Sequence, residues 1–203
     1  MKPVTTQKTL VTGVILAGGK ARRMGGQDKG LVELSGKPMI EYVIETIKPQ
    51  VNSIIVNANR NLSQYKEYGF PVISDDLTGY HGPLAGIDSC MQVIDTLLML
   101  SVPCDSPFVP NDLVERLYKQ LEKEQADISV AHDGNRMQPV FSLIKIECLD
   151  SLLDFLSRDE RKIDRWYAQH KVAITDFSDK PETFININKP EDINQIESEN
   201  VKT

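Results

Sequence analysis

The chain has 203 residues, which suits one α/β domain with a sizeable buried core. Hydrophobic residues make up 40% and charged residues 26%, as in ordinary globular proteins, and the net charge of −6 argues against nucleic acid as the main partner. No apolar run approaches the roughly 18 residues that a membrane span needs, so we expect no membrane attachment.

The cysteines and the first residues of the chain bear on its compartment. Cys90, Cys104 and Cys148 are too few and too far apart for a disulfide framework, which favours a reducing environment. Residues 1–10 are polar and lack the apolar centre of a signal peptide. We therefore expect a soluble, cytoplasmic protein.

The first predicted strand, residues 13–16, leads into a loop, residues 17–30, that combines glycines with cations. These residues are Gly18, Gly19, Gly25, Gly26, Lys20, Arg22, Arg23 and Lys29. Glycines let the backbone approach a ligand and point free N–H groups at it, and the cations favour an anion, a polyphosphate most of all. The loop has neither the Walker A spacing nor Gly-x-Gly-x-x-Gly, so it is a third kind of phosphate loop. For Arg22 and Arg23 alone, a solvated surface is the alternative.

Residues 31–34 are predicted to be extended, and a helix begins at Pro38, a residue suited to a first helical position. The apolar side chains of this helix fall on one face: Met39, Ile40, Val43, Ile44 and Ile47. The next strand, residues 53–57, ends at Asn57, with Asn59 just beyond it. An amide side chain there either stabilises a turn or hydrogen-bonds a base or ribose.

A short helix at residues 62–68 and a strand at 71–73 follow, and the chain then reaches Asp75 and Asp76. Paired aspartates after a strand suit either a metal site or an ordinary loop. A second glycine-rich loop, residues 79–86, opens another helix. The buried stripe of that helix is Leu84, Ile87, Met91 and Ile94.

Residues 96–105 are the best candidate for a central strand, because near-continuous apolar residues suit a parallel strand that is buried on both faces. The stretch ends at Asp105, where Pro103 and Pro107 fix the turn. A carboxylate at this point can hold Mg²⁺, which takes carboxylate oxygens and shares the rest of its shell with phosphate and water. A helix N-cap or a turn is the alternative role for Asp105.

The second half of the chain is also predicted to contain both helices and strands. The predicted elements are a helix at 110–124, strands at 127–131 and 138–144, helices at 147–156 and 163–170, a strand at 183–188 and a last helix from Pro190. The turn at Asp133–Gly134 joins two close strands, which predicts an antiparallel excursion. The period of two along residues 183–188 puts Asn186 and Asn188 on one face.

Together these elements predict a single Rossmann-like α/β domain over residues 1–203, with a mostly parallel sheet flanked by helices and a small antiparallel excursion. Residues 1–10 and 199–203 are expected to be loose ends. Ligands of open α/β sheets bind beyond the carboxyl ends of the strands. The phosphate loop and Asp105 should therefore share a cleft.

Several of these segments resemble one family. Leu16-Ala-Gly-Gly19, Arg23-Met-Gly25 and Lys29 look like the signature of the nucleotidyltransferases that make nucleoside-diphosphate-linked products. The longer stretch 13–30 resembles one branch, the molybdenum cofactor guanylyltransferases. The resemblance covers nearly the whole chain, through Val56–Asn59, Gly82–Gly86, Pro103–Asp105 and Asn186–Glu191.

This resemblance implies roles for particular residues. The GTP site would consist of Leu16, Ala17, Gly18, Lys29, Asn57, Asp75 and Asp105. Arg23 and Lys29 would be catalytic: Arg23 would hold the β- and γ-phosphates, and Lys29 would meet the charge that develops during transfer. Asp105 would bind Mg²⁺ as the cofactor. The acceptor would face Gln138, Asn186 and Asn188.

The reaction implied is transfer of GMP from GTP to the phosphate of molybdenum-bound molybdopterin, with release of pyrophosphate and formation of the guanine dinucleotide cofactor. Cofactor-delivery proteins and molybdoenzymes are further candidate partners. The residues alone do not separate guanine from cytosine, so a cytidylyltransferase or a sugar-phosphate nucleotidyltransferase is the alternative enzyme. A non-catalytic nucleotide- or cofactor-binding protein is the other alternative, although binding alone needs neither Lys29 nor a metal at Asp105.

Overall fold

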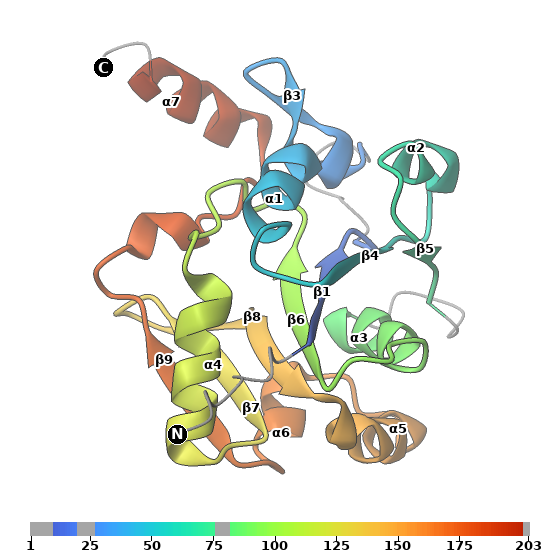
Figure 1. Cartoon of the computed structure of the whole chain (residues 1–203). Helices are drawn as coiled ribbons and strands as arrows, with labels where there is room; N and C mark the ends of the chain where they lie inside the picture. The colour runs from blue at the N-terminus through green and yellow to red at the C-terminus, as the bar shows by residue number, and fades with distance from the viewer. Residues whose placement is uncertain (1–9, 20–26, 76–81, 201–203) are drawn as a thin grey trace, which may run out of the picture.

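The computed structural model describes residues 10–19, 27–75 and 82–200 (Figure 1). Arg23 and Asp76 lie outside these ranges, as do residues 1–9 and 201–203 of the two predicted loose ends. In the part of the chain that is described, no helix is both long enough and apolar enough to cross a membrane.

A seven-stranded sheet forms the centre of the molecule, in the order β5-β4-β1-β6-β8-β7-β9. The strands are β1 (Val11–Leu16), β4 (Ser53–Asn57), β5 (Val72–Ile73), β6 (Leu98–Pro103), β7 (Ile128–His132), β8 (Met137–Lys145) and β9 (Val172–Asp176). Strand β8 pairs antiparallel with both β6 and β7, and the other neighbouring pairs in the sheet are parallel. The α/β class and the mostly parallel sheet are confirmed, and the antiparallel excursion lies within the sheet.

Helices cover both faces of the sheet (Figure 1). They are α1 (Met39–Ile47), α2 (Leu62–Lys66), α3 (Pro83–Met91), α4 (Leu113–Glu124), α5 (Leu149–Ser157), α6 (Ile163–Tyr167) and α7 (Pro190–Asn200). One buried cluster joins α1, α2 and α4 to the sheet, and a second joins α3, α5 and α6 to its other face. Val14 and Ile15 of β1 belong to different clusters, because successive side chains of a strand point to opposite faces.

Short elements complete the fold. A two-stranded antiparallel sheet pairs β2 (Glu33–Leu34) with β3 (Lys37–Pro38). The 3₁₀ turns among the described residues are η2 (Lys29–Leu31), η3 (Ile146–Cys148) and η4 (Pro181–Phe184). A third, smaller cluster packs α7 against β2 and α1 through Leu34, Met39, Ile187 and Ile193. This cluster brings the end of the chain beside the segment that follows the phosphate loop.

One sequence expectation for the last third of the chain is wrong, and one strand there was missed. Residues 183–188 do not form a strand: η4 covers the start of this segment and irregular chain follows. The edge strand there is β9, Val172–Asp176, which the sequence reasoning did not predict. Strand β9 is extended because β7 offers it a parallel partner from Ile128 to His132. Residues 183–188 have no strand partner, and the Ile187 N–H instead donates to the Asp105 carbonyl at 2.9 Å.

His170 gives the fold a pH dependence that can be tested. Its imidazole packs on Trp166 and shares a 2.9 Å hydrogen bond with Ser151 Oγ, and burial lowers its pKa below the ordinary value of 6.5 against the opposing effect of Asp127. Between the two pKa values the unfolded chain binds more protons than the folded one, so stability rises with pH. The contribution is fully present above pH 6.5 and is lost as the pH falls.

Urea unfolding over roughly pH 5 to 8 measures this effect, because that range spans the titration of histidine. We expect the free energy of unfolding of the wild type to increase with pH across the lower part of this range. In His170→Gln the slope should be smaller. Equal slopes in the two proteins would contradict the assignment to His170.

Candidate functional site

The candidate site lies where three neighbouring parallel strands end. Leu16 of β1 is in register with Asn57 of β4 on one side and with Pro103 of β6 on the other. The backbone continues this pairing, since the Ala17 N–H donates to the Asn57 carbonyl at 2.8 Å and the Cys104 N–H donates to the Leu16 carbonyl at 3.1 Å. The start of the phosphate loop and the residues that follow β4 and β6 are therefore adjacent.

Lys29 and Asp105 meet at this edge. The Lys29 ammonium donates to Asp105 Oδ2 at 2.7 Å and also to Asn188 Oδ1. Asp105 is buried, with 8% of its surface exposed. Three segments that are far apart in sequence thus converge on one ammonium group. Of the two predicted catalytic cations, Lys29 belongs to this cluster, and Arg23 is outside the described residues.

A second polar cluster follows β4 and β5. Asn57 Nδ2 donates to Asp75 Oδ1 at 2.8 Å, and Asn59 Nδ2 donates to Asp75 Oδ2 at 2.8 Å. The Asp75 N–H returns a 2.8 Å hydrogen bond to Asn59 Oδ1. Asn59, whose role the sequence left open, thus holds both the backbone and the carboxylate of Asp75. A carboxylate held by two amides is a fixed acceptor, suited to donors on a base or ribose.

The two glycine-rich segments pack closely against these amides. A Cβ added to Gly18 would lie 2.9 Å from Asn59 Nδ2, and one added to Gly86 would overlap Asn57 Oδ1. Helix α3 therefore approaches β4 closely because residue 86 has no side chain.

The resemblance to nucleotidyltransferases puts Asn57 in a nucleotide site, so we expect Gly86→Ala to weaken nucleotide binding. Asn57 is 2% exposed and bonded to Asp75, so it has little room to retreat from a methyl group. Relief of the clash should move Asn57, cost about 2 kcal/mol of stability and raise the Kd for GTP roughly tenfold. Calorimetric titration with GTP, beside a thermal melt, measures both effects. A variant with unchanged GTP affinity would show that Asn57 is not part of the nucleotide site.

The residues predicted on the acceptor side do not all lie together. Asn188 contacts Lys29, and Asn186 Oδ1 accepts a 2.6 Å hydrogen bond from Ser106 Oγ, next to Asp105. Gln138 lies at the start of β8, where its Nε2 donates to Asp133 Oδ2 at 2.6 Å. The structure thus brings the two asparagines to Lys29 and Asp105 although their segment is not a strand.

Sequence reasoning missed a buried carboxylate directly before Lys29. Asp28 is 7% exposed and hydrogen-bonds to Tyr65 and Asn61. The hydrogen-bond partners of Asp28 lie more than thirty positions away in the sequence. The only sequence signal for a role of Asp28 was therefore its neighbour Lys29.

Asp105 could hold a divalent cation together with a substrate. Among the described residues, no group of three or more His, Cys, Asp and Glu side chains is arranged to hold a metal ion. A cation at Asp105 would therefore take its remaining ligands from phosphate and water, which is how Mg²⁺ is usually bound beside a nucleotide. The buried Asp105 carboxylate, which lies beside Lys29 of the phosphate loop, fits such a shared ion.

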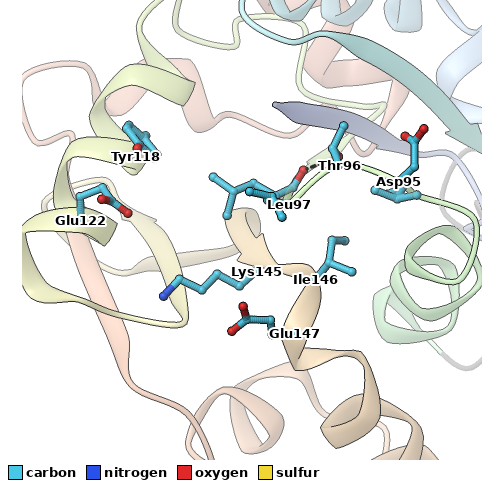
Figure 2. Close-up of a pocket in the computed structure, with 10 residues that line it drawn as sticks. Asp95, Thr96, Leu97, Tyr118, Glu122, Lys145, Ile146 and Glu147 are labelled. Atoms are coloured by element: carbon cyan, nitrogen blue, oxygen red, sulfur yellow. Dashed lines mark hydrogen bonds between the residues drawn. The ribbon is translucent and has the colours of Figure 1, made fainter. Parts of the chain in front are cut away.

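A surface pocket of about 510 Å³ lies at the opposite end of the central strands, where β6 begins (Figure 2). Leu97, Tyr118, Glu122 and Lys145 are among its lining residues. It sits at the start of β6, whereas Asp105 follows the end of the same strand. The pocket is therefore separate from the cluster around Lys29.

Comparison with known proteins places this arrangement in a family. The family model described as a MobA-like NTP transferase domain matches residues 13–174. A molybdenum cofactor guanylyltransferase of Shewanella sediminis is 56% identical over 92% of this chain and 95% of its own length. The protein of the same name from Shewanella halifaxensis is 53% identical over 92% of this chain and 93% of its own.

A solved structure agrees with these sequence matches. The molybdopterin-guanine dinucleotide biosynthesis protein A of Archaeoglobus fulgidus superposes with a TM-score of 0.77 at 25% identity, covering 95% of this chain and 100% of that one. The family model matches most of the chain, and these relatives are more than 50% identical to it, so the chain belongs to the family of MobA-like NTP transferases.

Proposed function

We propose that this protein transfers GMP from GTP to the phosphate of molybdenum-bound molybdopterin, releasing pyrophosphate and forming the guanine dinucleotide cofactor. The observation that carries the proposal is the convergence of Lys29, Asp105 and Asn188 at the mouth of the phosphate loop, in a chain more than half identical to molybdenum cofactor guanylyltransferases. We infer a cytoplasmic reaction. Cofactor-delivery proteins and molybdoenzymes are the proteins expected to dock.

Repulsion between the two anionic substrates explains why the site would need the cations Arg23 and Lys29. Both substrates are anions, so they repel each other until the site neutralises them and holds them in line. Backbone N–H groups near Gly18 would cradle phosphate, Arg23 would hold the β- and γ-phosphates, and Lys29 would stabilise the charge that develops on the transferred group. The acceptor phosphate is already ionised near neutral pH, so the transfer needs no general base.

Asp105 would hold Mg²⁺ through its carboxylate, with the triphosphate and water completing the coordination shell. When bound, the ion supplies positive charge to the phosphates of the donor. The residues around it orient the substrates. Lys29 bonds to Asp105 at 2.7 Å, so its ammonium lies beside the carboxylate that would hold the ion.

The nucleoside of GTP would lie over the ends of β1 and β4. Leu16, Ala17 and Gly18 would meet the nucleotide through their backbone, and Asn57 and Asp75 through their side chains. The fixed Asp75 carboxylate would accept hydrogen bonds from the sugar or the base. On the acceptor side, Asn188 and Asn186 would contact the pterin substrate beside Lys29, with Gln138 farther along the same edge.

Pyrophosphate release tests this function against its alternatives. Purified protein is incubated with Mg²⁺, the molybdopterin acceptor and, in separate reactions, GTP, CTP or ATP. Release with GTP that depends on the acceptor supports the proposal. Preference for CTP, or for a sugar phosphate as acceptor, would identify a sibling transferase. Binding of a nucleotide without release of pyrophosphate under any condition would identify a non-catalytic binder.

A further inference from the structure

Asp28 is a buried carboxylate, and the side chains that contact it in the described part of the chain come from one short segment. Tyr65 Oη donates to its Oδ1 at 2.6 Å, Asn61 Nδ2 donates to its Oδ2 at 3.0 Å, and Arg60 Nε lies 3.3 Å from Oδ2. The side chain of Asp28 is 3% exposed. Both oxygens are therefore occupied and shielded from solvent, so the carboxylate is suited to fixing its own backbone and not to reacting with a substrate.

The environment of Tyr65 keeps its hydroxyl protonated, so that it donates a hydrogen bond to this carboxylate. Tyr65 is fully buried, and burial, reinforced by the neighbouring Cys104 and by the hydrogen bond to Asp28, raises the pKa of its hydroxyl far above the ordinary range. The phenol thus keeps its proton at any pH at which the protein works. The hydroxyl also covers Gly30, where an added Cβ would lie 2.7 Å from Tyr65 Oη and 3.3 Å from Cys104 Sγ.

The backbone of Asp28 starts the turn that carries Lys29. Its carbonyl accepts hydrogen bonds from the Leu31 N–H at 3.0 Å and from the Val32 N–H at 3.1 Å, which closes η2. Lys29 lies between the fixed carboxylate of Asp28 and the covered Gly30. Its ammonium leaves this turn to reach Asp105 at 2.7 Å. Loosening either neighbour would therefore move the base of the lysine side chain.

The same segment also reaches the nucleoside side of the site. Asn59 holds Asp75 by two hydrogen bonds of 2.8 Å and closely faces Gly18, and Tyr65 and Asn61 hold Asp28 only a few residues later. Residues 59–65 thus connect Asp75, which is proposed to contact the nucleoside, to the turn of Lys29.

We propose that Asp28 and Tyr65 are positioning residues for nucleotidyl transfer, which aim the Lys29 ammonium at the transferred phosphate. The inference rests on the proposed function of Lys29. It assigns a mechanistic purpose to α2, whose Tyr65 is otherwise only a buried aromatic residue. A charge misplaced by about 1 Å can cost up to 10²-fold in rate without weakening substrate binding to a similar extent.

Tyr65→Phe is the sharpest test, because it removes one hydroxyl and keeps the buried ring. We expect kcat for GTP to fall roughly tenfold while KM for GTP changes less than about twofold. Tyr167→Phe is the matched control: Tyr167 is also buried, and its hydroxyl bonds to Ser142 Oγ and to the Pro139 carbonyl, both at 2.8 Å. It should lose stability without losing kcat. An equal effect of the two variants on kcat would overturn the proposal.

Gly30→Ala tests the same contact from the other side. The added methyl group should push the Tyr65 hydroxyl away from Asp28, so this variant should show the same loss of kcat. In the double variant Gly30→Ala with Tyr65→Phe the hydroxyl is absent. Its kcat should therefore resemble that of Tyr65→Phe alone, because the two changes break one interaction. Independent, multiplicative losses would argue against the shared contact.

Hydrogen exchange gives a readout that needs no catalysis. In Tyr65→Phe the Leu31 and Val32 amides, which bond to the Asp28 carbonyl, should exchange roughly tenfold faster than in the wild type, and Tyr167→Phe should leave them unchanged. Unchanged exchange in Tyr65→Phe would overturn the proposal even if kcat fell. If the wild type itself released no pyrophosphate, the transfer function would fail, and the exchange rates would still decide whether Tyr65 fixes this turn.

Discussion

Replacing Lys29 by alanine is expected to lower kcat for guanylyl transfer by about 10² to 10³, the usual loss when one preorganised electrostatic contact is removed from a transition state. The ammonium is held by Asp105 and Asn188, so it needs little reorganisation to face the transferred phosphate. KM for GTP should change less than kcat, because in the proposed mechanism Lys29 meets a charge that develops only during transfer. Initial rates of pyrophosphate release measure both constants.

Lys37→Ala is a matched control for this variant. Lys37 forms a 2.5 Å ion pair with Glu45 and is 28% exposed in its side chain, against 21% for Lys29, but it lies on β3. Its loss should leave kcat unchanged, since an exposed ion pair contributes little. Lys29→Arg, which keeps the charge in a larger planar group, should recover part of the rate. A Lys29→Ala enzyme with the wild-type kcat would remove Lys29 from the mechanism.

The sequence was most informative where one physical cause determines an element. Strand β6 could be predicted because its apolar residues are buried on both faces of the sheet. Helix α1 could be predicted because its buried residues recur at helical spacing. Strand β9 could not, because at the edge of the sheet its extended form depends on pairing with β7, a partner about forty residues earlier in the chain.

In the candidate site, too, features with a local sequence pattern could be predicted and features that depend on distant partners could not. Lys29 and Asp105 could be proposed from the chain because a loop of glycines and cations and a carboxylate after a strand are both local patterns. Asn59 bonds to Asp75, 16 positions away, and Tyr65 bonds to Asp28, 37 positions away. Neither pair could be predicted, because no local sequence pattern connects its two residues. Asn186 and Asn188 were expected on one strand face, but irregular chain anchored by Ile187 carries them to the site.

Asp105→Asn is expected to abolish transfer that depends on Mg²⁺. The amide keeps the size of the carboxylate but removes its charge, and neutral oxygens hold Mg²⁺ weakly. The variant also leaves the Lys29 ammonium without its counter-ion at 2.7 Å. The fold should survive, because the Asp105 carbonyl that accepts from the Ile187 N–H is unchanged by the substitution.

Two measurements separate the metal from the protein fold. Pyrophosphate release over a series of Mg²⁺ concentrations should saturate for the wild type and stay at background for Asp105→Asn, and calorimetry should show Mg²⁺ strengthening GTP binding in the wild type alone. Asp112→Asn is the control: Asp112 pairs with Lys180 at 2.8 Å, so the same substitution breaks an ion pair that does not include Lys29 or Asp105. If Asp105→Asn kept a Mg²⁺-dependent rate like that of Asp112→Asn, another group would have to hold the ion, and the pairing of Lys29 with Asp105 would be an ordinary salt bridge. Loss of the Mg²⁺ dependence in Asp105→Asn alone would tie the metal to the carboxylate that faces Lys29.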